Sequence, residues 1–167
     1  RWQHGNALVA TGGVAALIAG MQAHVEVAAV QQEGSSALAS ISGFGSGADV
    51  VMAAGGVAAV VAGMRAHVGV AKVQEWSIST LKNITGAGSA GTDAVVAAGG
   101  VAANVAGMQA LLGVEEVQTW GITTLACVAD NIHTGSTRVV AADGVKAIVA
   151  GMQAHVGVAE VQTQGSN

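Results

Sequence analysis

Residues 55–84 read GGVAAVVAGMRAHVGVAKVQEWSISTLKNI, and this stretch decides how the rest of the chain is interpreted. Further versions of it begin at Gly12, Gly99 and Asp143, so successive versions are 43, 44 and 44 residues apart. A Met and a Val-Gln pair recur at the same spacing in every version. A fixed period of this length is typical of proteins built by stacking equivalent structural units. We therefore expect one continuous core running through the chain of 167 residues.

The composition limits the classes of partner. Apolar residues make up 51% of the chain and charged residues only 10%, whereas soluble domains carry roughly 25% charged residues. The formal net charge is −4 and the Lys and Arg residues are scattered, which argues against nucleic acid because phosphate binding needs clustered cations. No run of about 18 or more strongly apolar residues occurs, so we expect no membrane-spanning helix.

The chain has a single cysteine, Cys127, and no proline. One cysteine excludes a disulfide within the chain and favours an intracellular, cytoplasmic location, where thiols stay reduced. The absence of proline leaves the expected helices uninterrupted. Because the aromatic residues are few, the core must be packed by Val, Leu, Ile and Met between closely approaching, Ala- and Gly-rich helices.

Each repeat divides into three segments that we expect to be helices. The first is short, as in Ala94–Ala98, and Asp49 and Asp93 stand where such helices are expected to begin. A Gly pair, such as Gly55 and Gly56, then breaks the helix and lets the chain turn sharply.

The second and third segments are amphipathic. In the second segment, apolar residues recur at i, i+3, i+4 and i+7, the spacing of one face of an α-helix. The third segment places its predicted core positions on one side of a helix at about 100° per residue. Asn104 puts one polar side chain at a predicted core position of the second segment. The predicted core positions include Val57, Val60, Val61 and Met64, then Val73, Ser77, Thr80, Leu81 and Ile84, and in the last repeat Val145, Ile148, Val149 and Met152.

The pattern G-G-V-x-x-x-V-x-x-M, followed by V-Q and then L-x-N-I, resembles the armadillo repeat over essentially the whole chain. HEAT repeats have a similar period but are typically helix pairs, whereas three helices are expected here. The resemblance implies an all-α, right-handed superhelical solenoid of three-helix repeats, with about three and a half repeats. It divides this single array into a partial repeat 1–11, repeats 12–54, 55–98 and 99–142, and a partial repeat 143–167.

The resemblance also implies that the third helices line a concave groove that binds protein partners, often as extended peptides. A second stripe on the third segment, at +3, +6 and +10 from its first Val, lies beside the core stripe and is expected to face that groove. Trp offers a flat apolar face with an N–H donor, and Asn offers a donor and an acceptor to a peptide backbone. The predicted partner-binding residues are Glu33, Ser36, Ser40, Trp76, Ser79, Asn83, Trp120, Thr123 and Cys127.

The two tryptophans have two open interpretations. In the first, Trp76 and Trp120 contact a partner in the groove, since Trp is enriched at binding hot spots. In the second, they only fill the space between neighbouring repeats. If the groove binds a peptide, the expected centre of the contact is the repeat that holds Trp76, Ser79 and Asn83 together.

No residue set in the sequence predicts an active site, a metal site or a cofactor. His24, His67 and His155 are equivalent by repeat, but stacked helices lie roughly 10 Å apart, too far for ligands that must reach one ion at about 2 Å. Cys127 has no base at a compelling spacing. The glycines do not follow the phosphate-binding pattern G-x-x-x-x-G-K-[ST].

The expected function is therefore that of a non-catalytic, protein-binding scaffold that presents the groove of third helices to a protein or extended peptide. The alternative is a structural or self-assembling module, a homo-oligomer in which uncapped terminal repeats associate end to end. Stacked repeats normally need polar capping repeats for solubility, and uncovered ends favour head-to-tail contacts. An enzyme has no positive support in the sequence.

Overall fold

The computed structural model describes residues 12–131 and 135–166, and within these ranges every regular element is a helix. The chain is therefore all-α over its described residues, as the sequence predicts. The helices are α2 (Val14–Ala23), α3 (Ala28–Ser42), α4 (Gly47–Ala53), α5 (Gly56–Ala66), α6 (Ala71–Gly86), α7 (Ser89–Ala97), α8 (Gly100–Ala110), α9 (Glu115–Ala129), α10 (Gly135–Ala141), α11 (Gly144–Ala154) and α12 (Ala159–Gly165).

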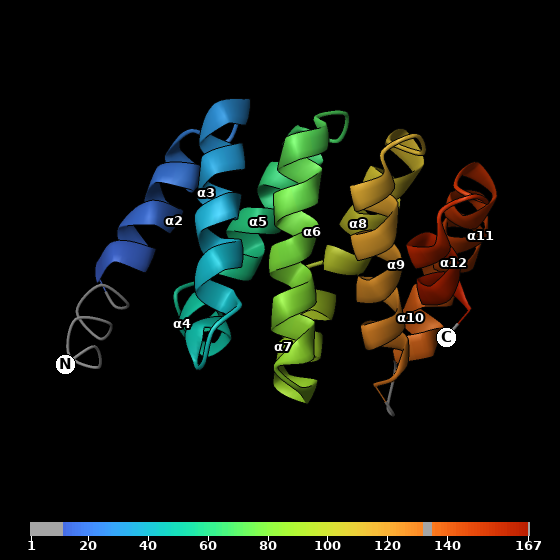
Figure 1. Cartoon of the computed structure of the whole chain (residues 1–167). Helices are drawn as coiled ribbons and strands as arrows, with labels where there is room; N and C mark the ends of the chain where they lie inside the picture. Colours follow the sequence, from blue (N-terminus) through green and yellow to red (C-terminus); the bar gives the residue numbers. More distant parts are fainter. Residues whose placement is uncertain (1–11, 132–134, 167) are drawn as a thin grey trace.

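The helices form two rows that follow the order of the chain. The helices α3, α6, α9 and α12 pack side by side, and Figure 1 shows them as the front row. The helices α2, α5, α8 and α11 contact one another in the same order behind that row. The short helices α4, α7 and α10 lie towards the lower ends of the front helices in this view.

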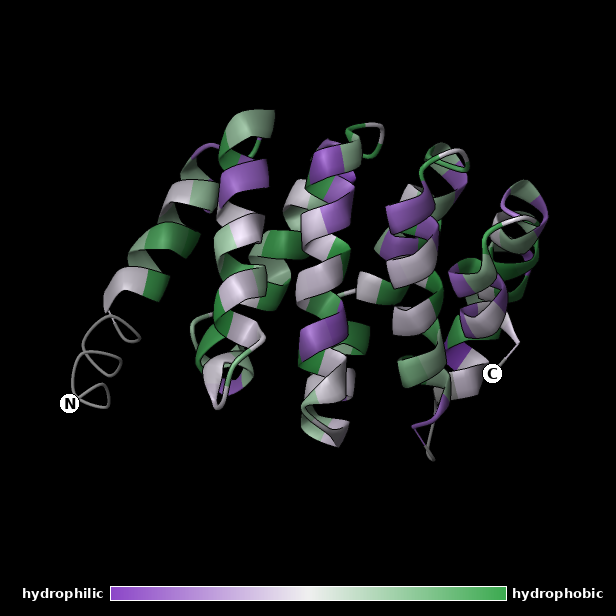
Figure 2. Ribbon diagram, in the orientation of Figure 1, coloured by the Kyte–Doolittle hydropathy of each residue, from purple (hydrophilic) through white to green (hydrophobic). Residues whose placement is uncertain are grey.

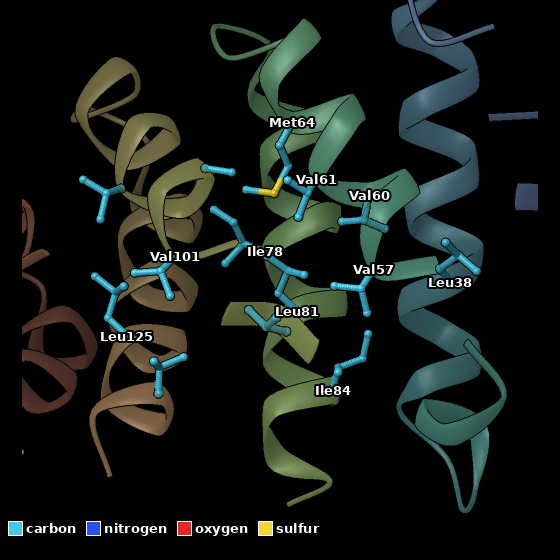
Figure 3. Packing of buried hydrophobic residues seen from close by; sticks show 14 of the residues in the cluster. Leu38, Val57, Val60, Val61, Met64, Ile78, Leu81, Ile84, Val101 and Leu125 are labelled. Carbon is cyan, nitrogen blue, oxygen red and sulfur yellow. The ribbon is translucent and has the colours of Figure 1, made fainter. Parts of the chain in front are cut away.

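The hydrophobic core lies between the two rows. The four predicted apolar residues of α5 are at most 6% exposed, and all five predicted core positions of α6 are fully buried. Figure 3 shows Val57 and Val61 of α5 close to Ile78 and Leu81 of α6. Full burial of such a side chain contributes roughly 1.5–3 kcal/mol, so this layer is a major source of stability. The predicted stripes are confirmed for these two helices.

The stripe prediction is wrong for part of α11. Val145 is 53% exposed and Val149 is 46% exposed, whereas the equivalent Val57 and Val61 of α5 are 6% and 2% exposed. The helix α5 is covered both by α6, which has 16 residues, and by α8. The helix α11 contacts α8 on one side, but the helix α12 that follows it has only 7 residues, and no described helix comes after α12.

The two glycines at the start of α5, Gly55 at the N-cap and Gly56 as the first residue, act differently. Gly55 has φ of 81°, a left-handed conformation that glycine adopts without the steric cost of a Cβ. Gly56 permits a close approach instead, because a Cβ there would lie 2.5 Å from the Cγ1 atom of Val51 and 2.9 Å from the Val51 carbonyl oxygen. The predicted sharp turn is confirmed, and the turn needs both glycines for separate reasons.

The short helices begin earlier than the sequence predicts. The helix α4 starts at Gly47 and α7 at Ser89, so Asp49 and Asp93 lie two and four residues inside them. The prediction that these aspartates begin the helices is therefore wrong. Asp49 still lies in the first turn of α4, where a negative charge interacts favourably with the helix dipole.

A glutamine ties each helix of the rear row to the front helix that follows it. The Nε2 atom of Gln74 donates to the carbonyl oxygens of Met64 and His67, at 2.8 and 3.0 Å. Carbonyls at a helix C-terminus have no partner within the helix, so the glutamine satisfies two of them and closes the turn. The equivalent pairs of hydrogen bonds are made by Gln31, Gln118 and Gln162.

Replacement of Asp143 by glycine is expected to raise the free energy of unfolding by about 0.5–1 kcal/mol. Asp143 has φ of 59°, in the position where α5 and α8 are preceded by glycine, and its side chain makes no capping hydrogen bond. Its ion pair with Lys146, at 2.9 Å, is exposed and contributes little. Urea denaturation followed by circular dichroism measures the change. A destabilised Asp143→Gly variant would show that the ion pair outweighs the backbone strain.

Candidate partner-binding surface

The nine predicted site residues lie on three neighbouring front helices, three on each of α3, α6 and α9. Glu33 and Ser40 are exposed and the other seven are half-buried, so every one of them reaches the surface. Figure 2 shows polar residues on the viewer-facing sides of these helices. We call the face formed by these nine residues, together with Gln32, Lys72, Glu75, Lys82 and Glu116, the α3–α6–α9 surface.

A lysine of α6 contacts one of the two tryptophans, Trp120. The Nζ atom of Lys82 on α6 lies 4.4 Å from the centroid of the Trp120 ring on α9, within cation–π range. Trp120 is half-buried and also packs against the hydrophobic core. Trp76 is half-buried on α6. The space between α6 and α9 is thus partly filled by Trp120, while one part of each ring remains open to solvent.

Asn83 joins two helices. Its Nδ2 atom donates to the carbonyl oxygen of Ala39, at 3.0 Å, and to the Oγ atom of Ser42, at 3.3 Å, both on α3. The amide nitrogen carries only two hydrogens, so both are used by this bridge. Asn83 can therefore offer a ligand its Oδ1 acceptor, and the predicted role as a donor to a peptide backbone loses its basis.

Two of the four hydroxyl groups on this surface donate to their own helices. Ser40 donates to the carbonyl oxygen of Ser36 at 3.0 Å, and Thr123 donates to that of Thr119 at 2.8 Å. Such hydroxyls keep their oxygen lone pairs as acceptors. Cys127 is half-buried and lines an open cavity of about 430 Å³ together with Asp93 and Asp130.

Sequence reasoning missed the charged residues that extend and flank the predicted stripe. Lys72 and Glu116 lie one helical turn before the +3 position, on the same side of their helices. They were missed because α6 begins at Ala71 and α9 at Glu115, two residues before the Val taken as the start. A helical-wheel projection that started two residues earlier would have placed Lys72 and Glu116 on the predicted stripe.

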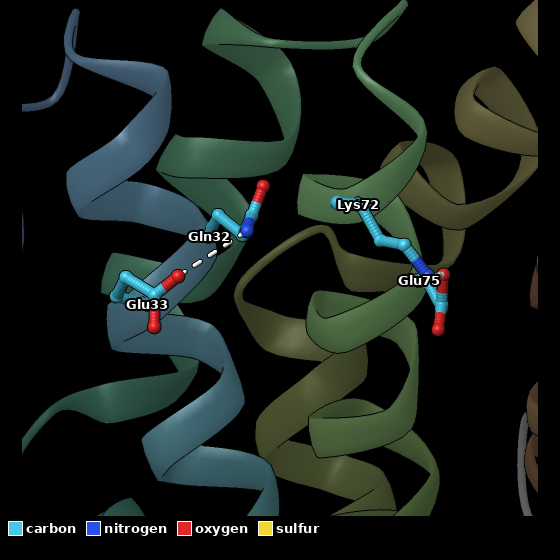
Figure 4. Close-up of polar contacts among 4 residues, drawn as sticks. All are labelled: Gln32, Glu33, Lys72 and Glu75. Carbon is cyan, nitrogen blue, oxygen red and sulfur yellow. Dashed lines mark hydrogen bonds and ion pairs between the residues drawn. The ribbon is translucent and has the colours of Figure 1, made fainter.

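Two polar pairs lie on α3 and α6 (Figure 4). The Nζ atom of Lys72 lies 2.6 Å from the Oε2 atom of Glu75, and the Nε2 atom of Gln32 donates to the Oε1 atom of Glu33 at 3.2 Å. The hydrogen bond and negative charge of Glu75 raise the pKa of Lys72, and Glu116 adds to that shift. The surface thus carries charges of both signs around the tryptophans.

The equivalent histidines join neighbouring repeats. The Nε2 atom of His67 lies 2.7 Å from the carbonyl oxygen of Val25, and that of His155 lies 2.7 Å from the carbonyl oxygen of Leu112. A carbonyl oxygen only accepts, so the imidazole nitrogen is the donor in both contacts. Across residues 12–131 and 135–166, no three His, Cys, Asp or Glu side chains gather where they could hold a metal ion.

Asn104, the polar residue at a predicted core position, is fully buried. Its Nδ2 atom donates to the carbonyl oxygen of Gly121 at 2.9 Å, which ties α8 to α9. Its Oδ1 atom has no hydrogen-bond partner. An unpaired buried acceptor destabilises the fold, so Asn104 contributes to the contact between the rows at some cost in stability.

No single helix of the described segments is long and apolar enough to cross a membrane, and only α4 and α5, taken together across a 77° bend, reach the required length and hydropathy. Comparison of the chain with models of protein families, with curated proteins and with solved structures finds no match in any of the three.

Proposed function

We propose that the chain is a non-catalytic protein-binding scaffold with an armadillo-like architecture, a right-handed superhelical solenoid of about three and a half three-helix repeats. The two rows of helices packed in chain order support this architecture. The glutamine hydrogen bonds that recur at equivalent positions in every repeat support it too, because they repeat the same junction along the array.

The partner that fits the α3–α6–α9 surface is a protein segment in extended conformation. The observation that carries this proposal is that Trp76 on α6 and the Lys82–Trp120 pair, which joins α6 to α9, all reach the surface of two neighbouring helices. Half-exposed tryptophan rings can bury apolar side chains of a partner, and such residues dominate the energy of many interfaces. Ser79 and the Oδ1 atom of Asn83 lie on the same helix and supply acceptors for backbone N–H groups.

Replacement of both Trp76 and Trp120 by alanine is expected to weaken peptide binding at least about tenfold. Peptides selected from a random display library against the wild-type chain serve as the probe, and isothermal titration measures their dissociation constants. Because both rings are only half-buried, the double variant should keep the helical circular dichroism spectrum of the wild type.

Phe44→Ala is the matched control. Phe44 is 80% exposed in the connection between α3 and α4, outside the α3–α6–α9 surface, so its removal should leave peptide affinity unchanged. If the double tryptophan variant binds the peptides as tightly as the wild type, the α3–α6–α9 surface is not the peptide-binding surface. A selection that yields no peptide binder would count against an extended peptide as the partner.

A further inference from the structure

Three side chains of the α3–α6–α9 surface stand at equivalent positions on neighbouring helices. Glu33 of α3, Trp76 of α6 and Trp120 of α9 each follow, by three residues, the Val of the recurring Val-Gln pair. All three reach the surface. Their helices pack side by side, α3 against α6 and α6 against α9 (Figure 1). We call these three side chains the +3 row.

The spacing of the +3 row is set by how closely its helices pack. The Oγ atoms of Ser35 on α3 and Ser77 on α6 lie 3.0 Å apart, and the Oγ1 atom of Thr80 donates to the carbonyl oxygen of Ser35 at 3.1 Å. Helices in direct contact have axes roughly 8–10 Å apart. Successive members of the row are therefore separated by about that distance.

Only one of the two common extended backbone conformations has this period. In a β-strand, side chains on one side recur every second residue, at about 6.6 Å and then at about 13 Å. A polyproline II helix has three residues per turn and rises about 3.1 Å per residue, so side chains on one side recur about every 9 Å. Every third residue of a polyproline II segment therefore meets one member of the +3 row.

The two tryptophans of the row suit proline. Both rings are half-buried, and among the described residues the Nε1 atom of neither ring has a hydrogen-bond partner. Polyproline II segments have no internal hydrogen bonds, so their carbonyl oxygens are free to accept from such N–H groups. Aromatic surfaces bind P-x-x-P segments at a low cost in entropy, because the conformation of the segment is preformed.

Glu33 sets the charge at the third place of the row. It is exposed, and its carboxylate accepts a hydrogen bond from Gln32 but takes part in neither of the ion pairs found among the described residues. At the other end of the row, the ammonium group of Lys82 already lies over the Trp120 ring. A cationic side chain of a partner is therefore favoured beside Glu33 and disfavoured beside Trp120, which gives the row a charge direction.

Building on the proposed binding of an extended segment, we propose that the partner is a proline-rich segment in the polyproline II conformation. Two prolines three residues apart contact Trp76 and Trp120, and a Lys or Arg three residues beyond the proline on Trp76 pairs with Glu33. The segment has the pattern K/R-x-x-P-x-x-P or its reverse, because a polyproline II helix can lie along the row in either direction. The N–H groups of the intervening residues find acceptors in Ser79 and in the Oδ1 atom of Asn83.

Three peptides of equal length and composition test the spacing. Each carries fluorescein, two prolines and one arginine in a background of alanine and serine, and the prolines stand at i and i+2, at i and i+3, or at i and i+4. Fluorescence anisotropy up to about 1 mM protein measures the dissociation constants. The i+3 peptide should bind at least about tenfold more tightly than the other two. Equal affinities, tighter binding of another spacing, or no binding of the i+3 peptide would overturn the proposal.

Variants of the chain test the contacts. Trp76→Ala and Trp120→Ala should each weaken binding of the i+3 peptide at least about fivefold, whereas Phe44→Ala, at an exposed position outside the surface, should not change it. Undiminished binding by either tryptophan variant would show that the peptide lies elsewhere, and the proposal would fall.

Glu33→Gln tests the charge. It should weaken binding of the arginine peptide about twofold, and it should not change binding of a peptide with glutamine in place of arginine. An equal effect of Glu33→Gln on both peptides would overturn the placement of the basic residue.

The peptides selected from the random library separate this proposal from the proposed function on which it rests. If they lose affinity in the double tryptophan variant while the three proline spacings bind equally, the surface binds extended segments without a preference for polyproline II, and only the present proposal falls. If they keep their affinity in that variant, the α3–α6–α9 surface is not the binding surface and both proposals fall.

Discussion

Replacement of Gly91 by alanine is expected to lower the free energy of unfolding by about 3 kcal/mol or more. A Cβ at this position would lie far inside van der Waals contact of the carbonyl oxygen of Ile84, and 2.8 Å from its carbonyl carbon. Both atoms belong to the backbone of α6, so the clash cannot be relieved by a side-chain rotation. The short helix α7 would have to move away from the long helix that it contacts.

Gly86→Ala is the matched control for this prediction. Gly86 ends α6, and no atom of the described residues lies within 4 Å of its Cβ position. Its replacement should change the free energy of unfolding by no more than about 1 kcal/mol. Urea denaturation followed by circular dichroism compares the two variants. If both variants unfold at the same urea concentration, the close approach of α7 to α6 does not make alanine at position 91 destabilising.

The second large effect is expected for Gln74→Leu, which should cost about 3 kcal/mol. Gln74 is fully buried, and its Nε2 atom satisfies the carbonyl oxygens of Met64 and His67. Leucine has a similar size but no donor, so the carbonyl oxygen of Met64 would lose its partner, while that of His67 would keep only the backbone N–H of Val70. The loss is partly offset because the Oε1 atom of Gln74 has no hydrogen-bond partner of its own.

Gln162→Leu is the control for the glutamine junction. Gln162 makes the same two hydrogen bonds, but it is half-buried at the end of the array, where water can replace the lost donor. Its replacement should cost less than about 1 kcal/mol. Thermal and urea unfolding of both variants measure the difference. Equal costs would show that burial does not set the value of this junction.

The buried faces of the helices could be predicted because they depend on a local property. Apolar residues spaced at the helical period must lie on one side of a helix, and α5 and α6 bury the predicted residues. The same rule failed at Val145 and Val149, because a periodic pattern says which side is apolar but not whether another helix covers it.

The surface position of the nine predicted residues, though not their role, could be predicted. The wheel placed the nine residues on the surface of three neighbouring helices, and each of them reaches the surface. It missed Lys72 and Glu116 because the helices begin before their first buried Val. The helical pattern also could not predict that the Nδ2 atom of Asn83 donates both of its hydrogens to α3, because that contact joins residues 44 apart in the chain.

The sequence by itself determined that the chain is helical, where its helices turn and which side of each helix is apolar, because helix period and glycine act over a few residues. The tertiary structure alone decided what the recurring Gln, His and Gly residues do. Gln31 meets Gly63 and His67 meets Val25 only when one repeat stacks on the next. Such contacts join groups far apart in the chain, and no local pattern specifies their distance.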